Sequence, residues 1–562
     1  MKIIEGDTFG RQPMLPAMGR AQRILFVSAE AFPLAKTGGL ADVCAALPKA
    51  LARLGCDVRL LVPGYADALE NLCDPRVVAE LGDVLPGTDV RLIAGTLPGT
   101  ALPVLLVDCP VLYCRPGALY VDADGHDWAD NARRFAVLCH VAARVALGRA
   151  GDGWRPDVVH AHDWHAGLVP LLLRRSGQSA PPSVFTIHNA AFQGNFPLSE
   201  AGSLGLPGDL LDVDGIEYYG QLSFLKAGVR FADKLTTVSP GYAREIQEAE
   251  YGCGLEALFT ARADDLSGIM NGIDTELWNP AADPLLPCVY SIDDTSGKAS
   301  CKSALQHEMG LRLDAQAPLV VSVCRLTHQK MSDVLLYALP QMLDRHPRLQ
   351  VAIHGRGDRE LEAGFRALAA GRDDGRLAVH IGYDEGRAHR LQAGADILLQ
   401  GARFEPCGLT QLYAMRYGTI PIVTRIGGLA DSVVDHDGAF RQEGATGFTF
   451  DHPTCDAMLG ALHRCLDLYA EDPAGWSTLC RFAMSRDSGW SQSAMAYLNL
   501  YGKLAAANPA YAVAAVELPA RAWSDVSTTQ ATAPRQPRTA TVRVREEREG
   551  AMPLMADGRQ QG

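Results

Sequence analysis

Short apolar runs recur along the chain, and each is followed by a polar turn and then by apolar residues at helical spacing. The first run spans residues 24–28, and helical spacing follows over residues 41–51. A run that is apolar throughout is typical of a strand buried on both faces, and strands that alternate with helices predict a parallel sheet. The runs that predict strands are 24–28, 57–63, 104–107, 157–160, 184–187, 235–239, 318–323, 351–355, 377–381, 397–399 and 418–423.

This alternation is interrupted by a turn at residues 271–274 and restarts at residue 318, which predicts two successive α/β domains. Helical spacing over residues 490–504 predicts a closing helix that returns to brace the first domain. The end of the chain is rich in Pro, Thr and mixed charge, which is typical of disorder. We therefore divide the chain into a flexible N-terminal extension (1–21), a first domain (22–266), a second domain (267–482), the closing helix (483–506) and a disordered tail (507–562).

The composition is that of an ordinary globular protein, with 562 residues of which 48% are hydrophobic and 21% charged. A net charge of −13 disfavours a nucleic-acid or anionic-membrane surface, so a bound anion has to be held by a few placed cations. Nowhere do about 18 apolar residues run together, so we expect neither a membrane span nor a secretion signal. The 14 cysteines form no C-x-x-C pair, which fits a reducing compartment, and we expect a cytoplasmic protein.

Polar residues gather where the strands of the first domain are expected to end, at the edge where open α/β sheets bind ligands. Lys36-Thr37-Gly38-Gly39-Leu40 follows the first strand, and a glycine pair there lets a ligand approach the backbone, although such a pair can also be only a turn. Three histidines within residues 160–165 favour contacts to sugar hydroxyls over a metal site, because they lack a firm carboxylate partner. His188 ends another strand, where a lone histidine is either structural or catalytic.

The first strand end of the second domain carries two cations. Arg325 and Lys330 leave it five residues apart, which suits a diphosphate held without a metal ion. Gly355-Arg356-Gly357 lacks the third glycine of a dinucleotide fingerprint, so it gives only weak support to an NAD-dependent oxidoreductase. Tyr383 ends a further strand, where it could stack on a base or serve packing.

The stretch from residue 403 to residue 411 places a carboxylate at a strand-to-helix turn. Glu405 follows the apolar run that ends at residue 399, and helix formers follow over residues 411–417. Free N–H groups at a helix start favour an anion, so a sugar and a phosphate could meet there, although a lone Glu at a strand end is often only a solvated loop residue. A second glycine pair, at residues 427–428, follows a strand of the second domain, as the first pair follows a strand of the first domain.

Over about residues 22–505 the chain resembles the bacterial and plant glycogen and starch synthases. The blocks lysine-threonine-glycine-glycine-leucine and glutamate-proline-cysteine-glycine-leucine together are specific to that family. The matching blocks are residues 36–42, 160–167, 186–189, 271–274, 325–330, 403–411 and 427–431.

This resemblance implies an α/β fold of two facing Rossmann-like domains, the GT-B arrangement, with a C-terminal helix that returns to the first domain. It implies the retaining transfer of glucose from ADP-glucose to the non-reducing end of an α-1,4-glucan acceptor such as glycogen. No metal ion or other cofactor is expected, no nucleic acid or membrane is an expected partner, and the oligomeric state stays open. A related GT-B transferase that uses UDP-glucose or another acceptor is the alternative.

The resemblance also implies roles for individual residues. Arg325 and Lys330 would hold the diphosphate, Glu405 would contact glucose near the reacting carbon, and Tyr383 would stack on adenine. The residues expected to be catalytic are Glu405, His188, Lys330 and Arg325, and those expected to bind the donor are Lys36, Gly38, Gly39, Asp42, Asp163, Asn271, Tyr383, Gly408, Leu409 and Thr410.

Three positions depart from the family pattern without removing a charged group. Met331 stands where glycine is usual, Gln400-Gly401-Ala402 replaces a proline-serine pair, and Phe192 takes the place of a tyrosine. They put the local loop shape and the acceptor preference in doubt. A non-catalytic glucan-binding descendant would be expected to have lost Lys36, Lys330 or Glu405, and all three are present.

Overall fold

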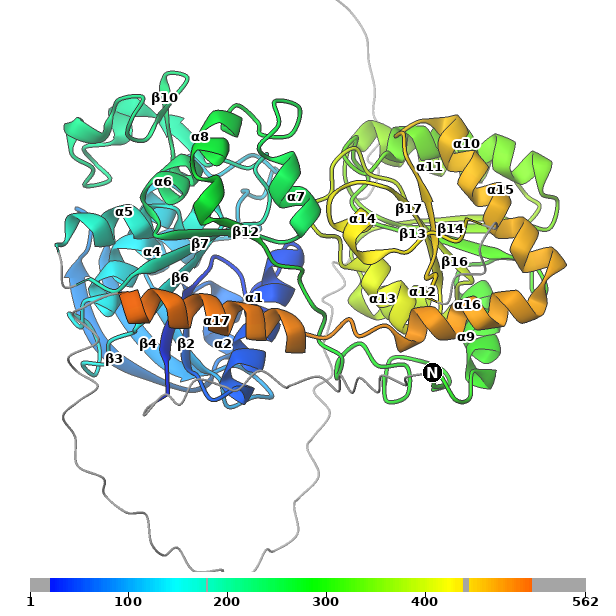
Figure 1. The fold of residues 1–562 in the computed structure, drawn as a ribbon, viewed down its shortest axis with the longest axis horizontal. Helices are drawn as coiled ribbons and strands as arrows, with labels where there is room; N and C mark the ends of the chain where they lie inside the picture. Colours follow the sequence, from blue (N-terminus) through cyan, green and yellow to red (C-terminus); the bar gives the residue numbers. More distant parts are fainter. Residues whose placement is uncertain (1–20, 178–179, 438–443, 508–562) are drawn as a thin grey trace, which may run out of the picture. The chain divides into compact units, whose positions relative to one another are not determined.

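The first half of the chain forms a nine-stranded sheet (Figure 1). The computed structural model describes residues 21–177, 180–437 and 444–507. The strand order of the sheet is β12-β11-β7-β6-β1-β2-β5-β4-β3, and every pair from β12 to β5 is parallel. The strands are β1 (Arg23–Val27), β2 (Asp57–Pro63), β3 (Cys73–Asp83), β4 (Asp89–Thr96), β5 (Pro103–Asp108), β6 (Val158–His162), β7 (Ser183–Ile187), β11 (Lys234–Thr237) and β12 (Leu266–Gly268).

Helices connect these strands, and a small sheet of order β8-β10-β9 lies in one connection. The helices are α1 (Gly39–Arg53), α2 (Ala66–Asn71), α3 (Pro110–Tyr113), α4 (Asn131–Ala146), α5 (Leu168–Arg175), α6 (Phe224–Phe231), α7 (Pro240–Glu245) and α8 (Glu256–Ala261), with short 3-10 turns η1 (Trp164–Ala166), η2 (Leu198–Glu200), η3 (Gly208–Leu210) and η4 (Ala263–Asp265). The small strands are β8 (Asn195–Pro197), β9 (Glu217–Tyr218) and β10 (Gln221–Ser223).

A six-stranded, fully parallel sheet carries the second half, in the order β15-β14-β13-β16-β17-β18. Its strands are β13 (Leu319–Val323), β14 (Gln350–Gly355), β15 (Leu377–Ile381), β16 (Ile397–Gln400), β17 (Ile420–Thr424) and β18 (Phe448–Phe450). The helices are α9 (Ser296–Glu308), α10 (Ser332–Arg345), α11 (Arg359–Ala370), α12 (Glu385–Gly394), α13 (Thr410–Arg416), α14 (Gly427–Ser432), α15 (Cys455–Glu471), α16 (Pro473–Ser485) and α17 (Ser491–Ala507). Both sheets belong to one compact unit, and the predicted α/β class with two Rossmann-like domains is confirmed.

The antiparallel hairpin β3–β4 at the edge of the first sheet is absent from the sequence prediction, which placed only a helix between β2 and β5. Most side chains of β3 are exposed, so the strand has no apolar run to mark it. The segments predicted before residue 21 and beyond residue 507 lie outside the described residues.

The strand order locates the ligand-binding edge of each sheet. In the first sheet β1 lies between β2 and β6, so the chain leaves β1 to one side and later returns on the other; β13 lies in the same way between β14 and β16. Ligands of open α/β sheets bind at the carboxyl ends of the strands beside such a switch point. The loops that follow β1, β13 and β16 carry the motifs singled out in the sequence.

The closing helix α17 packs on α1 and β6 of the first domain, as predicted (Figure 1). Its Tyr501 shares a 2.6 Å hydrogen bond with Nδ1 of His160, whose Nε2 shares another of 2.6 Å with Thr186. Burial holds the pKa of His160 well below its usual range, so the ring is neutral. His160 is therefore a core residue that fastens α17, and the expectation that it contacts sugar hydroxyls is wrong.

Replacement of Tyr501 by Phe should weaken this brace. The substitution leaves a ring nitrogen of His160 buried without its partner, which should lower the free energy of unfolding of the first domain by about 1–3 kcal/mol. Tyr337→Phe, at a residue that is 70% exposed, is the matched control and should change stability little. Urea denaturation of the three proteins measures the difference, and equal midpoints would show that the hydrogen bond contributes nothing.

Candidate active site

Glu405 lies in the turn between β16 and α13, with only 5% of its surface exposed. Its carboxylate accepts a hydrogen bond from Nζ of Lys330, on the loop that follows β13. Its main-chain oxygen accepts a hydrogen bond from the N–H of Gly428 at 3.0 Å. Side chain and backbone of Glu405 are thus fixed from two different loops of the second sheet.

The second glycine pair supports this turn. A Cβ added to Gly427 would lie 2.1 Å from the carbonyl oxygen of Glu405, and one added to Gly428 would lie 2.3 Å from Cα of Cys407. These distances are far below any real contact, so side chains at either position would push the turn away. The pair thus holds the Glu405 turn in place.

Residues of the first domain and of the connecting segment, the turn at residues 271–274 between the two domains, also hold the Glu405 turn. Ser239, which caps α7, donates from Oγ to the carbonyl of Pro406 at 2.6 Å. Glu245 accepts from the N–H of Gly427 at 2.7 Å, and Asn271 hydrogen-bonds Cys407. The candidate catalytic carboxylate therefore stands where both domains meet.

The two cations after β13 differ in their surroundings. Lys330 is half-buried and pairs with Glu405. Arg325 is exposed, donates to Gln329 at 3.2 Å and holds its guanidinium 5.9 Å from the ring centroid of Phe192. Arg325 has no ion pair among the described residues, so its charge is available to an anion.

Met331, the unusual residue after Lys330, has a left-handed backbone with φ 53° and ψ 29°, a conformation that glycine adopts most easily. Its side chain is 1% exposed, and its sulfur accepts from the hydroxyl of Thr424 at 3.6 Å. A Cβ added to Gly401 would lie 2.9 Å from that sulfur and 3.1 Å from Cβ of Met331. Two departures from the family pattern, Met331 and Gly401, are therefore complementary, because the larger side chain fills the space above the smaller residue.

We expect the two positions to be energetically coupled. Gly401→Ser should overpack the contact and cost about 1–3 kcal/mol of stability in the wild-type background. The same substitution should cost less in a Met331→Gly background, with a coupling energy of about 0.5–3 kcal/mol between the two sites. A double-mutant cycle of thermal or urea denaturation measures this coupling, and strict additivity would contradict it.

The loop after β1 is held by a buried acid. Glu30 is 3% exposed, and its Oε2 accepts from the N–H of Thr37 at 2.6 Å and of Gly38 at 3.2 Å. Burial raises its pKa, although a hydrogen bond from Tyr120 opposes the shift. A Cβ added to Gly38 would meet no protein atom within 4 Å, whereas one added to Gly39 would lie 3.3 Å from Leu409 of the second domain. The space above Gly38 is thus open to a ligand.

Lys36 joins the two domains. Its Nζ donates to Asp42 at 3.0 Å and to both oxygens of Glu385 at 3.0 and 3.1 Å. Burial alone would lower the pKa of Lys36, but the two carboxylates outweigh burial and raise it, so the ammonium stays charged. Burial raises the pKa of Asp42 to about 6 against the opposing effect of Lys36. Tyr383, which is 64% exposed, donates its hydroxyl to Glu385 at 2.5 Å.

Asp163 follows β6 and His188 follows β7, two neighbouring strands of the first sheet. Asp163 has a positive φ of 59°, which is uncommon outside glycine. Burial raises the pKa of Asp163 to about 8 and lowers that of His188 to about 3, so His188 is neutral and Asp163 is largely protonated at neutral pH. His188 shares a 3.0 Å hydrogen bond with His162.

Two buried acceptors at the site have no partner. Within the described part of the chain, Oδ1 of Asp163 and Oδ1 of Asn271 accept no hydrogen bond, although both residues are 7% exposed. Buried polar atoms are nearly always paired in folded proteins. Hydroxyl groups of a bound sugar could satisfy both.

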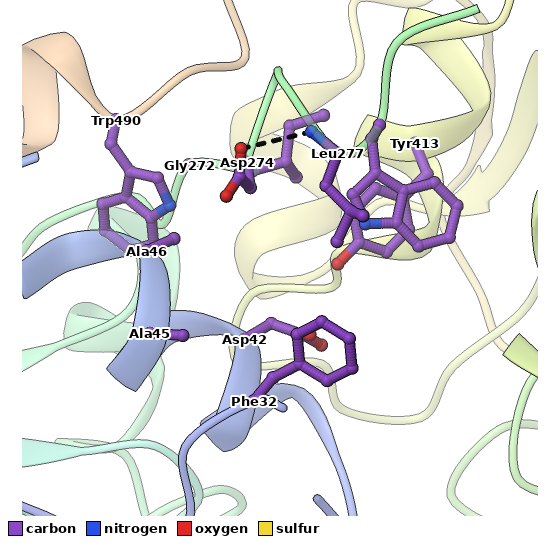
Figure 2. Close-up of a pocket in the computed structure, with 11 residues that line it drawn as sticks. Phe32, Asp42, Ala45, Ala46, Gly272, Asp274, Leu277, Tyr413 and Trp490 are labelled. Carbon is purple, nitrogen blue, oxygen red and sulfur yellow. Dashed lines mark hydrogen bonds between the residues drawn. The ribbon is translucent and has the colours of Figure 1, made fainter. Parts of the chain in front are cut away.

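A small cavity lies beside the connecting segment rather than at Glu405 (Figure 2). Asp42 lines it, but Glu405, Lys330 and Arg325 do not, so it is not the place where the sugar is expected to react. Its lining residues are Phe32, Asp42, Ala45, Ala46, Gly272, Ile273, Asp274, Leu277, Trp278, Tyr413 and Trp490.

The structure brings Lys330 to Glu405, Lys36 to Asp42, and Gly39 to Leu409. Among the described residues, Arg325 forms no hydrogen bond or ion pair with Lys330 or Glu405. Gly408 has a φ of 72° and starts the approach to α13 with Leu409 and Thr410. The sequence prediction missed Glu30, Ser239, Glu245 and Glu385. Glu30 and Glu385 lie in the turns that follow predicted strands and could have been noticed there, whereas the contacts of Ser239 and Glu245 with the Glu405 turn join residues far apart in the sequence.

Among the described residues, one group could hold a metal ion by its geometry, namely Asp122, Asp124 and His126. This group lies on the loop between α3 and α4. In the same part of the chain, no helix combines the length and the hydropathy that crossing a membrane requires.

Comparison with known proteins agrees with this geometry. Residues 23–261 match the starch synthase catalytic domain, and residues 307–476 match the glycosyl transferases of group 1. Glycogen synthase from Burkholderia thailandensis is 69% identical over 481 residues, which cover 85% of this chain and 90% of the relative. Glycogen synthase from Paramagnetospirillum magneticum is 49% identical over 485 residues, 86% of this chain and 97% of the relative.

Solved structures show the same fold. The catalytic domain of Starch Synthase IV from Arabidopsis thaliana, bound to ADP and acarbose, is 32% identical with a TM-score of 0.79, covering 86% of this chain and 100% of that one. Sucrose-phosphate synthase from Thermosynechococcus elongatus shares the fold at 19% identity, with a TM-score of 0.54 over 86% of this chain and 100% of that one.

Fold and site together define a glucosyltransferase built from two Rossmann-like domains, the GT-B class. The resemblance seen in the motifs is confirmed over most of the chain. The chain belongs to the glycogen and starch synthase family.

Proposed function

We propose that the chain transfers glucose from ADP-glucose to the non-reducing end of an α-1,4-glucan, with retention of configuration and without a metal ion. The observation that carries the proposal is the pairing of Lys330 with a buried Glu405 at the meeting of the two domains, in a chain 69% identical to a glycogen synthase. The ADP and acarbose bound to the plant relative support a nucleotide donor and a glucan-like acceptor.

Charge develops at two places when the anomeric carbon separates from the diphosphate. The leaving diphosphate gains negative charge, which Arg325 and Lys330 would stabilise, and the sugar ring gains positive charge, which Glu405 would stabilise. The unpaired oxygens of Asp163 and Asn271 would accept hydrogen bonds from sugar hydroxyls. Fixed side chains thus take the part that a metal ion plays in other transferases.

Retention is best explained by front-face transfer. A double displacement needs a second carboxyl group about 5 Å from the nucleophile. The side chain of Glu405 pairs with Lys330 and shares no hydrogen bond with a second acid among the described residues, which favours the front-face route. In the front-face route the departing phosphate oxygen takes the proton of the acceptor 4-hydroxyl as the new glycosidic bond forms on the same face.

A panel of nucleotide sugars, each assayed with and without glycogen in excess EDTA, tests the proposal. We expect turnover of ADP-glucose that depends on glycogen, and a product in which the new linkage is α-1,4. Sole use of UDP-glucose would assign the chain to a related transferase with another donor, and turnover that requires an added metal ion would contradict the proposed role of the protein cations.

A further inference from the structure

Glu385 is a carboxylate that the expected donor-binding set does not include. It is the first residue of α12, and its side chain is 26% exposed in its ion pair with Lys36. One of its oxygens accepts from both Lys36 and the hydroxyl of Tyr383, and the other accepts from Lys36 alone. Glu385 therefore connects a first-domain residue with a second-domain residue at the proposed nucleotide site.

Given the proposed function, on which this inference rests, Glu385 lies beside one particular part of the bound nucleotide. In that function Tyr383 would face the adenine ring and Lys36 would approach the diphosphate. In ADP-glucose the ribose joins these two parts. A group within hydrogen-bond distance of both the Tyr383 hydroxyl and the Lys36 ammonium therefore lies at the level of the ribose.

Because Glu385 is negatively charged, the ribose is a better hydrogen-bonding partner for it than the phosphates are. The Lys36 ammonium already contacts two carboxylates, those of Asp42 and Glu385, so the three side chains carry more negative than positive charge when all are ionised. The Glu385 carboxylate itself repels a phosphate but accepts hydrogen bonds from neutral hydroxyls. Many dinucleotide-binding domains likewise bind the ribose through a carboxylate that accepts hydrogen bonds from its hydroxyl groups.

We propose that the Glu385 carboxylate recognises the ribose of the donor by accepting hydrogen bonds from its hydroxyl groups. Lys36 holds the carboxylate in position from the opposite domain. The contact between Lys36 and Glu385 then forms part of the donor site itself.

Binding of ADP, 2′-deoxy-ADP and 3′-deoxy-ADP to the full chain, measured by calorimetry, tests this role. A hydrogen bond to a charged group is worth enough that the wild type should bind ADP about 10- to 100-fold more tightly than at least one deoxy analogue. Glu385→Ala should bring this ratio close to one, and Glu385→Gln, which keeps one acceptor oxygen, should give an intermediate ratio. Glu360→Ala, at an exposed Glu in the first turn of the neighbouring α11, should leave the ratio as in the wild type.

Two results would overturn the inference. If Glu385→Ala weakened all three nucleotides by the same factor, Glu385 would act only as a link between the domains. A wild type that binds both deoxy analogues as tightly as ADP would show that no hydroxyl is recognised. In either case glycogen-dependent turnover of ADP-glucose by the wild type would leave the proposed function intact, whereas the absence of that turnover would remove the proposed function itself.

Discussion

Glu405→Gln should lower kcat by about 100- to 1,000-fold, the range seen when one fixed group that stabilises transition-state charge is removed. The substitution keeps the shape of the side chain and removes its charge. KM for glycogen should change little, because the loss falls on the transition state rather than on acceptor binding. Initial rates of glucose transfer from ADP-glucose into glycogen measure both parameters.

A matched control separates chemistry from folding. Asp396 forms a similar ion pair with Lys302 at 2.7 Å, with side chains 13% and 7% exposed, but it lies before β16 rather than after it. Asp396→Asn should therefore reduce stability without reducing kcat. Wild-type kcat in Glu405→Gln would exclude the proposed role of the carboxylate, whereas equal losses of kcat in both variants would trace the effect to folding.

Lys330→Met should also lower kcat by about 100-fold or more, because it removes a cation from the leaving diphosphate. Its effect has a second source, since the substitution leaves Glu405 buried without its partner. We expect KM for ADP-glucose to rise together with the fall in kcat. Lys330→Arg should restore only part of the rate, because a planar guanidinium cannot take the place of a compact ammonium.

The double variant Lys330→Met/Glu405→Gln tests whether the two residues act as a unit. Groups that act together show strongly non-additive losses, so the double variant should lose little more than the worse single variant. Lys302→Met serves as the control at the ion pair with Asp396 and should keep kcat. Losses that multiply across the two sites would contradict a shared role.

The parallel strands and the ligand-binding edge could be predicted because a strand that is buried on both faces consists of consecutive apolar residues. The polar residues in the loops that follow these apolar runs, such as Lys36, Arg325 and Glu405, could be singled out for the same reason. The hairpin β3–β4 could not, because a strand with mostly exposed side chains has no such run. His160 was misjudged because its partner Tyr501 lies 341 residues away in the sequence.

Contacts between the domains were the least predictable part of the site. Ser239 holds Pro406 across 167 residues, and Lys36 reaches Glu385 across 349. No local pattern encodes such a pair, since each partner taken alone is an ordinary polar residue beside a turn. The roles of the individual site residues in catalysis and donor binding stay predictions that the variants described above can test.

If one donor is held from both domains at once, ADP binding in the presence of EDTA depends on cations of both domains. Wild type, Lys36→Ala and Lys330→Ala should be titrated with ADP by calorimetry under the same conditions. We predict that each single variant binds ADP at least about 10-fold more weakly than the wild type, because each loses a charged contact to the same ligand. Undiminished ADP affinity in Lys36→Ala would contradict a site shared by the two domains.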